Sequence, residues 1–449
     1  MATIFIPLII GIVFIIVSTS KWHLHPFLAL LISAYFIAFM TGIDSSEIAG
    51  IIGQGFGKTL SGIGIVIIAG TLIGVILQKS GATITISNAI LRVVSDKRPI
   101  SAMSIIGYIV SIPVFCDAAF VILSSINKSL AAKSKTSLIP ISIGLSTGLY
   151  APHVLIPPTP GPIAAAANLE MNNLFMVIIT GIIIAIPVVV VGHLYAKYLS
   201  KKYKFAPQQD NDFEIQMAEL NEIPSPKLWM ALAPILVPIL LMALGTTTGL
   251  MKESGNTMLE TIFTFVGSPT NALLIGLGFA MLLLPSWDKT TLTDWMEDGL
   301  SNAAKIIIIT GMGGALGAII QQLPLGDYLG NNLSQSSLGL LIPFIIAAIL
   351  KTAQGSSTVA IITTSAILFP VLPELGLDSN MGKTWVIMAI GSGAMTVSHA
   401  NDSYFWVVSK FSNMDILTAY KTHTTATAIQ GFTGIIFVYL GYFLTQFWT

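Results

Sequence analysis

The chain has 449 residues, of which 54% are hydrophobic and only 9% carry a charge. Globular domains carry about 25% charged residues, so this composition excludes an ordinary soluble protein. The 21 basic and 21 acidic residues cancel, and without a basic excess no nucleic-acid partner is expected. The single cysteine, Cys116, excludes an intrachain disulfide or a thiol cluster, and no metal or cofactor is predicted.

Long apolar runs recur along the chain, and they approach the roughly 20 residues that a helix needs to cross a hydrocarbon core of about 30 Å. The first run begins at Ile4 without a basic residue before it or a small-residue cleavage site after it, which predicts a retained span and no signal peptide. The expected fold class is therefore an all-α polytopic protein of the lipid bilayer. The ten predicted spans are 4–19, 26–41, 60–78, 137–168, 174–195, 228–250, 260–284, 303–322, 384–411 and 424–446.

Two further apolar stretches, 100–126 and 338–370, are each interrupted by polar residues. Basic residues flank the first stretch on both sides, so the positive-inside tendency is met only if it enters and leaves the membrane on the cytoplasmic side. This pattern predicts a re-entrant hairpin with its tip at 112–117, and a second hairpin in 338–370. Irregular backbone at membrane depth is tolerated only inside protein or along a wet cavity, so each tip is expected beside a transport pathway.

The long polar segment 197–227 begins with several lysines and predicts a cytoplasmic linker. It separates a first repeat, 1–196, from a second, 228–449, each with five spans and one hairpin. An odd number of spans gives the two halves opposite orientations and places both termini outside. The similarity of 70–78 to 313–321 supports two inverted-topology repeats.

After each hairpin, a predicted span contains helix-breaking residues, at 151–162 and at 398–402. These two broken helices, near 137–168 and 384–411, are typical of secondary transporters that bind substrate between the breaks. An anion channel or facilitator is the less favoured alternative. An enzyme is not predicted, because phosphate-binding, metalloprotease and serine-hydrolase motifs are absent from the sequence.

Ionisable side chains within apolar segments are costly to bury, so each is a candidate for function. Asp117, at the first tip, is a candidate proton carrier, with a helix N-cap as the alternative. His153 lies in the first break and also fits proton coupling. The second break holds His399, Asn401 and Asp402 within four residues, a polar density that favours a binding site over a loop at the membrane edge.

Ser356, Ser357 and Thr358 place hydroxyls and backbone N–H groups at the predicted start of a helix in the second hairpin. Such a start suits an anionic ligand, and simple N-capping is the alternative. Lys351, just before this tip, either pairs with a carboxylate or extends to the interface.

Other polar positions are assigned no part in transport. His193 and His423 lie near span ends and are expected to be structural. The acidic segments 44–47 and 288–298 are expected to form solvated loops.

Four segments, 22–30, 155–162, 354–360 and 391–406, resemble the gluconate permease family (GntP type) of the ion transporter superfamily, and the resemblance covers essentially the whole chain. It implies a bacterial inner-membrane symporter that imports gluconate or a related sugar acid with protons, and it favours a homodimer. The ionisable groups Asp117, Asp402 and His153 are the predicted proton-coupling residues. The implied residues for the small organic anion are Pro157, Pro158, Ser356, Ser357, Thr358, His399, Asn401 and Asp402.

One departure from the family pattern affects the expected substrate. Many gluconate transporters of this family carry a glutamate where Asp117 stands, so the carboxylate here has a shorter reach. Relatives that handle D-serine lack the His-x-Asn pattern of 399–401, which makes an amino acid the less expected substrate. Gluconate is predicted first, with glycerate, fructuronate or a 2-keto sugar acid as alternatives.

Overall fold

The computed structural model is helical throughout the part of the chain that it describes, which confirms the all-α prediction. The described residues are 2–22, 24–94, 98–171, 173–204, 226–250, 258–323, 339–399 and 402–446. In the first half the helices are α1 (Ala2–Ser20), α2 (Pro26–Met40), α3 (Ser45–Lys79), α4 (Ala82–Val94), α5 (Pro99–Val110), α6 (Cys116–Ser134), α7 (Leu138–Leu155), α8 (Pro160–Asn168) and α9 (Leu174–Lys202). In the second half they are α11 (Leu228–Leu250), α12 (Met258–Gly267), α13 (Pro269–Met281), α14 (Lys289–Gln321), α16 (Leu341–Gln354), α17 (Ser357–Leu368), η1 (Phe369–Val371), α18 (Asn380–Met395), α19 (Ser403–Phe411), α20 (Ile416–Ala419), η2 (Tyr420–Thr424) and α21 (Thr425–Gln446).

Two of the helices, α3 and α14, begin earlier than predicted. The Asp44 carboxylate accepts the Ser46 amide at 2.9 Å, and the Asp288 carboxylate accepts the Thr291 amide at 2.6 Å. Each aspartate therefore caps a helix and satisfies a free N–H group, and these hydrogen bonds lower the pKa of both carboxyl groups. The prediction of solvated loops at 44–47 and 288–298 is wrong for this reason.

Five described helices are long and apolar enough to cross a membrane, or up to seven if two bent pairs each count as one span. Leu138–Asn168, which includes both α7 and α8, is 94% buried over its most apolar window, whereas Leu228–Gly245 is 28% buried. These two segments therefore differ in how much of their surface is covered by other parts of the chain. The count of ten spans and the inverted repeat stay predictions.

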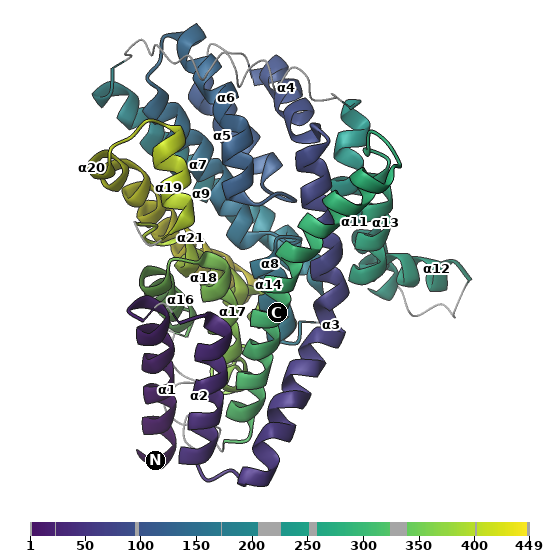
Figure 1. Ribbon diagram of the computed structural model, residues 1–449, viewed down its shortest axis with the longest axis vertical. Helices are drawn as coiled ribbons and strands as arrows, with labels where there is room; N and C mark the ends of the chain where they lie inside the picture. Colours follow the sequence, from purple (N-terminus) through teal and green to yellow (C-terminus); the bar gives the residue numbers. More distant parts are fainter. Residues whose placement is uncertain are drawn as a thin grey trace.

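Helices end in all four segments where the sequence is interrupted. The gaps lie between α5 and α6, between α7 and α8, between α16 and α17, and between α18 and α19. Helices of the first half pack against helices of the second, with α3 on α14, α6 on α19, α7 on α18 and α8 on α17. This packing places α8, α14, α17 and α18 near the middle of the molecule (Figure 1). The re-entrant course of the two hairpins stays a prediction.

Helix α3 lies directly against the first tip through Gly74. A Cβ atom at this position would stand 2.6 Å from the Pro113 carbonyl oxygen, which is closer than real side chains allow. The backbone of the tip therefore rests on α3 because position 74 has no side chain.

Gly74→Ala is expected to push α3 and the tip apart and to lower the free energy of unfolding by about 1–3 kcal/mol. Thermal unfolding of purified protein in detergent measures this change. Gly64→Ala in the same helix is the matched control, because a Cβ there meets no atom within 4 Å. Equal melting temperatures for the two variants would contradict the close contact.

Candidate functional site

A cavity of about 550 Å³ lies where three of the four interruptions meet. Its volume is within the range of small-molecule sites, about 300–1,000 Å³. Both halves of the chain contribute to its wall. The polar residues that line it are Gln78, Asp117, Tyr150, His153, Asn302, Lys305, Ser356, Ser357, Thr358, Asp402, Ser403 and Tyr404.

Asp402 is the most heavily bonded carboxylate of the cavity wall. Its Oδ1 atom accepts the Tyr404 amide at 3.0 Å and so caps α19. Its Oδ2 atom accepts hydrogen bonds from the Ser398 hydroxyl and from the Lys351 ammonium group. The residue is only 5% exposed, so it is held in one position from three sides.

Lys351 is the cation of this buried pair. It is 1% exposed, and its Nζ atom also donates to the Gly355 carbonyl oxygen at 2.6 Å. Of the two alternatives for Lys351, the carboxylate pair is therefore correct and extension to the interface is wrong. A buried ion pair is stable only with such additional hydrogen bonds, because both charges have left water.

The turn between α16 and α17 depends on Gly355 and Ser356. Gly355 has φ +81°, a left-handed conformation that ends α16 and that other residues adopt at a cost. The Ser356 hydroxyl accepts the Val359 amide at 3.3 Å and caps α17. Capping thus occurs at Ser356, while Ser356, Ser357 and Thr358 also line the cavity.

Asp117 connects the first tip to the second break. It lies in the first turn of α6, whose N-cap is Phe115, so the N-cap alternative for Asp117 is wrong. One carboxylate oxygen accepts the Ser403 hydroxyl at 2.8 Å, and the other accepts the Cys116 thiol at 3.4 Å. Segments 286 residues apart therefore meet through this carboxylate.

Two buried histidines lie near these carboxylates. His153 lines the cavity, and its Nδ1 atom has no hydrogen-bond partner among the described residues. His423 lies on η2, with Nε2 3.1 Å from the Ser398 hydroxyl and Nδ1 3.4 Å from the Ser146 hydroxyl. The sequence predicts a structural role for His423, and these contacts link it through Ser398 to Asp402.

Some predicted substrate-binding residues are not among the described residues that line the cavity. Pro157 and Pro158 are not among its lining residues, and the Pro158 carbonyl packs against Gly70 of α3. The His399 Nε2 atom is 2.9 Å from the Thr352 carbonyl oxygen. Asn401 lies outside the described residues. Binding by these four residues stays a prediction.

The sequence analysis did not identify Gln78, Asn302 and Lys305 as cavity residues. Lys305 lies within the predicted span 303–322, so the rule that intramembrane charges are functional candidates applies to it as well. Gln78 and Asn302 carry no comparable signal, because single amides are common near span ends.

Comparison with known proteins shows the family of the chain. Residues 3–444 match the family model described as GntP family permease. The chain belongs to the GntP permease family. This confirms the resemblance, and it identifies a membrane transport protein rather than an enzyme.

Curated relatives of this GntP permease match over nearly their whole length. It is 33% identical to the inner membrane permease YgbN of Escherichia coli, with 95% of each chain covered. It is 29% identical to a gluconate permease of Pseudomonas aeruginosa, with 96% of each covered. It is 32% identical to the D-serine transporter DsdX of Escherichia coli, with 98% of this chain and 97% of the relative covered. The family places the protein in a bacterial inner membrane, and overall identity does not separate the two substrates.

A solved structure resembles the fold of this permease. The Alcanivorax borkumensis YdaH transporter superposes with a TM-score of 0.57 and 13% sequence identity, covering 89% of both chains. At this identity the likeness concerns the fold alone.

Proposed function

We propose that this GntP permease is a secondary active transporter that imports gluconate or a closely related sugar acid together with a proton. The observation that carries the proposal is the cavity of about 550 Å³, in which two carboxylates, a histidine and a helix start from different parts of the chain meet. Convergence of helix breaks on one site is the arrangement that secondary transporters use to bind charged substrates.

The substrate carboxylate is proposed to bind at the start of α17, near Ser356, Ser357 and Thr358. Free N–H groups and the positive end of the helix dipole both favour an anion there. Hydroxyl groups of a sugar acid then have polar partners in the same cavity, such as Gln78 and Asn302. Gluconate is preferred because relatives named gluconate permeases match nearly the whole chain, and because the chain carries the His-x-Asn pattern of 399–401 that relatives handling D-serine lack.

Proton coupling is proposed to involve Asp117 and Asp402, with His153 beside them. A carboxylate that takes a proton loses its charge, and a neutral group costs less to move through a low-dielectric layer. The two carboxylates lie on different elements that contact each other, α6 and the start of α19. A proton is therefore able to affect both helix breaks at once.

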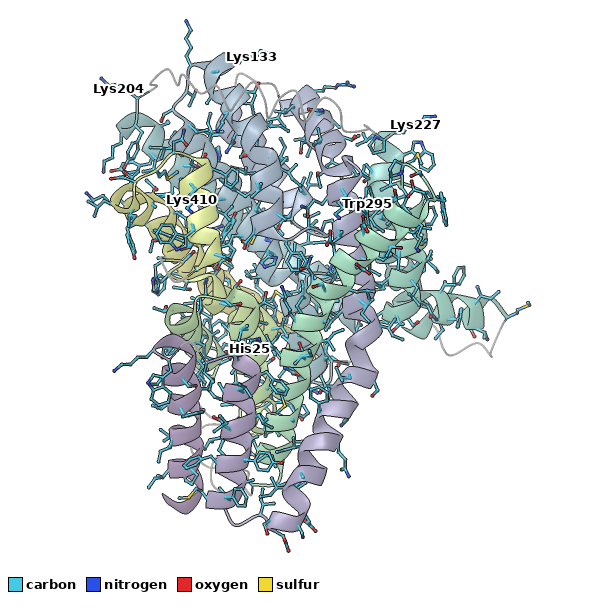
Figure 2. All side chains as sticks on the ribbon, viewed as in Figure 1. His25, Lys133, Lys204, Lys227, Trp295 and Lys410 are labelled. Atoms are coloured by element: carbon cyan, nitrogen blue, oxygen red, sulfur yellow. The ribbon has the colours of Figure 1, made fainter. Side chains whose placement is uncertain are left out.

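The proposed orientation puts the lysine-rich end of the molecule in the cytoplasm. Lys133, Lys204 and Lys227 all lie at the upper end in Figure 2, although they belong to different segments. Positively charged residues concentrate on the cytoplasmic side of inner-membrane proteins, which supports this orientation.

A second cavity supports alternating access. It measures about 500 Å³ and is lined by residues around Gly55, Asn168 and Phe369, near the far end of α17. The two cavities thus lie toward opposite ends of one short helix, as expected for entry routes to one central site.

The test is uptake into proteoliposomes with and without an imposed inward proton gradient. Labelled gluconate, glycerate, fructuronate and D-serine are offered separately. Accumulation of one sugar acid only when the gradient is present is the expected result. Equal uptake without a gradient would instead indicate a facilitator or channel, and uptake of D-serine alone would overturn the sugar-acid assignment.

Asp117→Asn separates coupling from structure at the first tip. Asparagine still accepts the Ser403 hydroxyl, but it cannot carry a proton, so we expect a loss of concentrative uptake of about 10²-fold or more with little change in stability. Ser403→Ala is the control, since it removes the hydrogen bond and keeps the carboxylate. Uptake that is lost in Ser403→Ala and kept in Asp117→Asn would assign the carboxylate a structural role.

A further inference from the structure

The ion pair between Lys351 and Asp402 joins the second tip to the second break just behind the cavity wall. Both groups that receive a hydrogen bond from Lys351, the Gly355 carbonyl and the Asp402 carboxylate, belong to residues that line the cavity. We propose that Lys351 binds the carboxylate of the substrate, and that a proton on Asp402 is what releases Lys351 to do so. This inference rests on the proposed function and adds the residue and the exchange that would couple proton to anion.

The position of Lys351 allows this exchange without movement of the lysine. Lys351 is anchored by Gly355 at the end of α16, and its ammonium group lies 6.0 Å from the centre of the Tyr150 ring. Two of its three N–H groups have acceptors on the cavity wall, so an anion beside Gly355 competes directly with Asp402 for the same cation. The lysine stays in place while its counter-ion changes.

The proton also has a defined place after the exchange. Oδ1 of a protonated Asp402 continues to accept the Tyr404 amide, so α19 keeps its cap. The new O–H on Oδ2 points to the Ser398 hydroxyl, which then accepts a hydrogen bond instead of donating one. Ser398 is also bonded to His423, so its hydroxyl has a second partner when it turns.

Charge balance explains why the two ions would move together. Without substrate, the Lys351–Asp402 pair holds one ammonium and one carboxylate and is neutral. The fully loaded site holds the ammonium, the substrate carboxylate and a neutral Asp402, and this exchange again leaves no net charge. A site with the proton alone gains one positive charge, and a site with the anion alone gains one negative charge. Uncompensated charge is costly in a buried site, so only the empty and fully loaded forms are suited to reorient.

Several other ionisable groups face Asp402 and must be controlled for. Asp117 is tied to the same break by its hydrogen bond from the Ser403 hydroxyl. Lys305 is exposed within the cavity and offers a second cation for the substrate. The remaining groups that interact electrostatically with Asp402 are Cys116, Tyr150, His153, Tyr404 and His423.

The experiment measures gluconate binding to the purified full-length protein in nanodiscs over a series of pH values. If each anion requires one proton on Asp402, the wild-type Kd rises about tenfold per pH unit wherever that carboxyl group is unprotonated in the empty protein. Asp402→Asn imitates the protonated state, so its Kd is expected to be low and constant with pH. A Kd that keeps the wild-type slope in Asp402→Asn would overturn the exchange.

The binding role of Lys351 is tested on a background without the ion pair. The double variant Lys351→Gln/Asp402→Asn carries neither charge. It therefore leaves no unpaired buried ion that would destabilise the fold. Relative to Asp402→Asn, it is expected to bind gluconate about 10- to 100-fold more weakly, the effect of losing a charged hydrogen bond. Its affinity for gluconamide, which has no carboxylate, is expected to stay the same. Equal gluconate affinity in the two variants would overturn the assignment.

Further measurements show whether Lys305 or Asp117 carries the exchange in place of Asp402, and whether the protein binds a sugar acid at all. Lys305→Gln and Asp117→Asn are each expected to keep the tenfold slope, whatever their effect on affinity, and loss of the slope in either one alone would move the exchange to that residue. Wild-type protein that binds no sugar acid at any pH would overturn the proposed function and the exchange together. Wild-type binding with proton-driven uptake but no slope would overturn only the exchange.

Discussion

Asp402→Asn is expected to abolish accumulation of substrate, the largest functional effect predicted for this permease. Asparagine accepts the Tyr404 amide as aspartate does, so α19 keeps its cap. It cannot exchange a proton with solvent, and the link between the proton gradient and the substrate is lost. In proteoliposomes with an inward proton gradient, the internal concentration of labelled gluconate is expected to rise no higher than the external one.

Counterflow distinguishes loss of coupling from loss of the protein. Proteoliposomes loaded with unlabelled gluconate need no net proton movement to exchange it for labelled gluconate, so this exchange is expected to continue in Asp402→Asn. Accumulation at the wild-type level in the variant would remove Asp402 from the coupling mechanism. Loss of exchange as well as accumulation would point to a damaged site and argue against a role limited to the proton.

Lys351→Met is expected to have the largest effect on stability. It leaves the Asp402 carboxylate buried, with its cation gone, and breaking one side of such a pair costs about 3–5 kcal/mol. Adding Asp402→Asn removes the unpaired charge and is expected to restore most of the loss. Thermal unfolding of the wild type, both single variants and the double variant in one detergent measures this recovery.

Lys58→Met provides the matched control for the stability measurement. Lys58 also pairs with an acid, Glu170, but the two side chains are 74% and 45% exposed. Exposed pairs contribute about 0–1 kcal/mol, so little change in the melting temperature is expected. If Lys351→Met/Asp402→Asn is as unstable as Lys351→Met, the lysine acts through packing and not through its charge.

The sequence predicted the helical, membrane-embedded character because that property depends on local composition. Runs of apolar residues near 20 in length leave helix as the simplest way to satisfy the backbone inside a bilayer. Interruptions at 113–117 and 355–358 were visible because prolines, glycines and polar residues disfavour continuous apolar helix at the positions where they stand. The family resemblance followed from the same local motifs.

The early starts of α3 and α14 show the limit of such composition arguments. Residues 45–59 and 289–302 are too polar to be read as spans, yet aspartate caps and packing between the two helices extend the helical structure through them. Polarity thus indicated where lipid contact ends, but it did not mark the ends of the helices.

The sequence alone determined which residue types stand at the interruptions, including Asp117, Asp402 and the hydroxyls of 356–358. How these groups are paired follows from the packing of the helices. Lys351 and Asp402 are 51 residues apart, and Asp117 and Ser403 are 286 apart, so no local pattern connects them. The partner of a buried charge is set by which helices pack together, because in a low-dielectric interior each charge must find its counter-ion within hydrogen-bond distance.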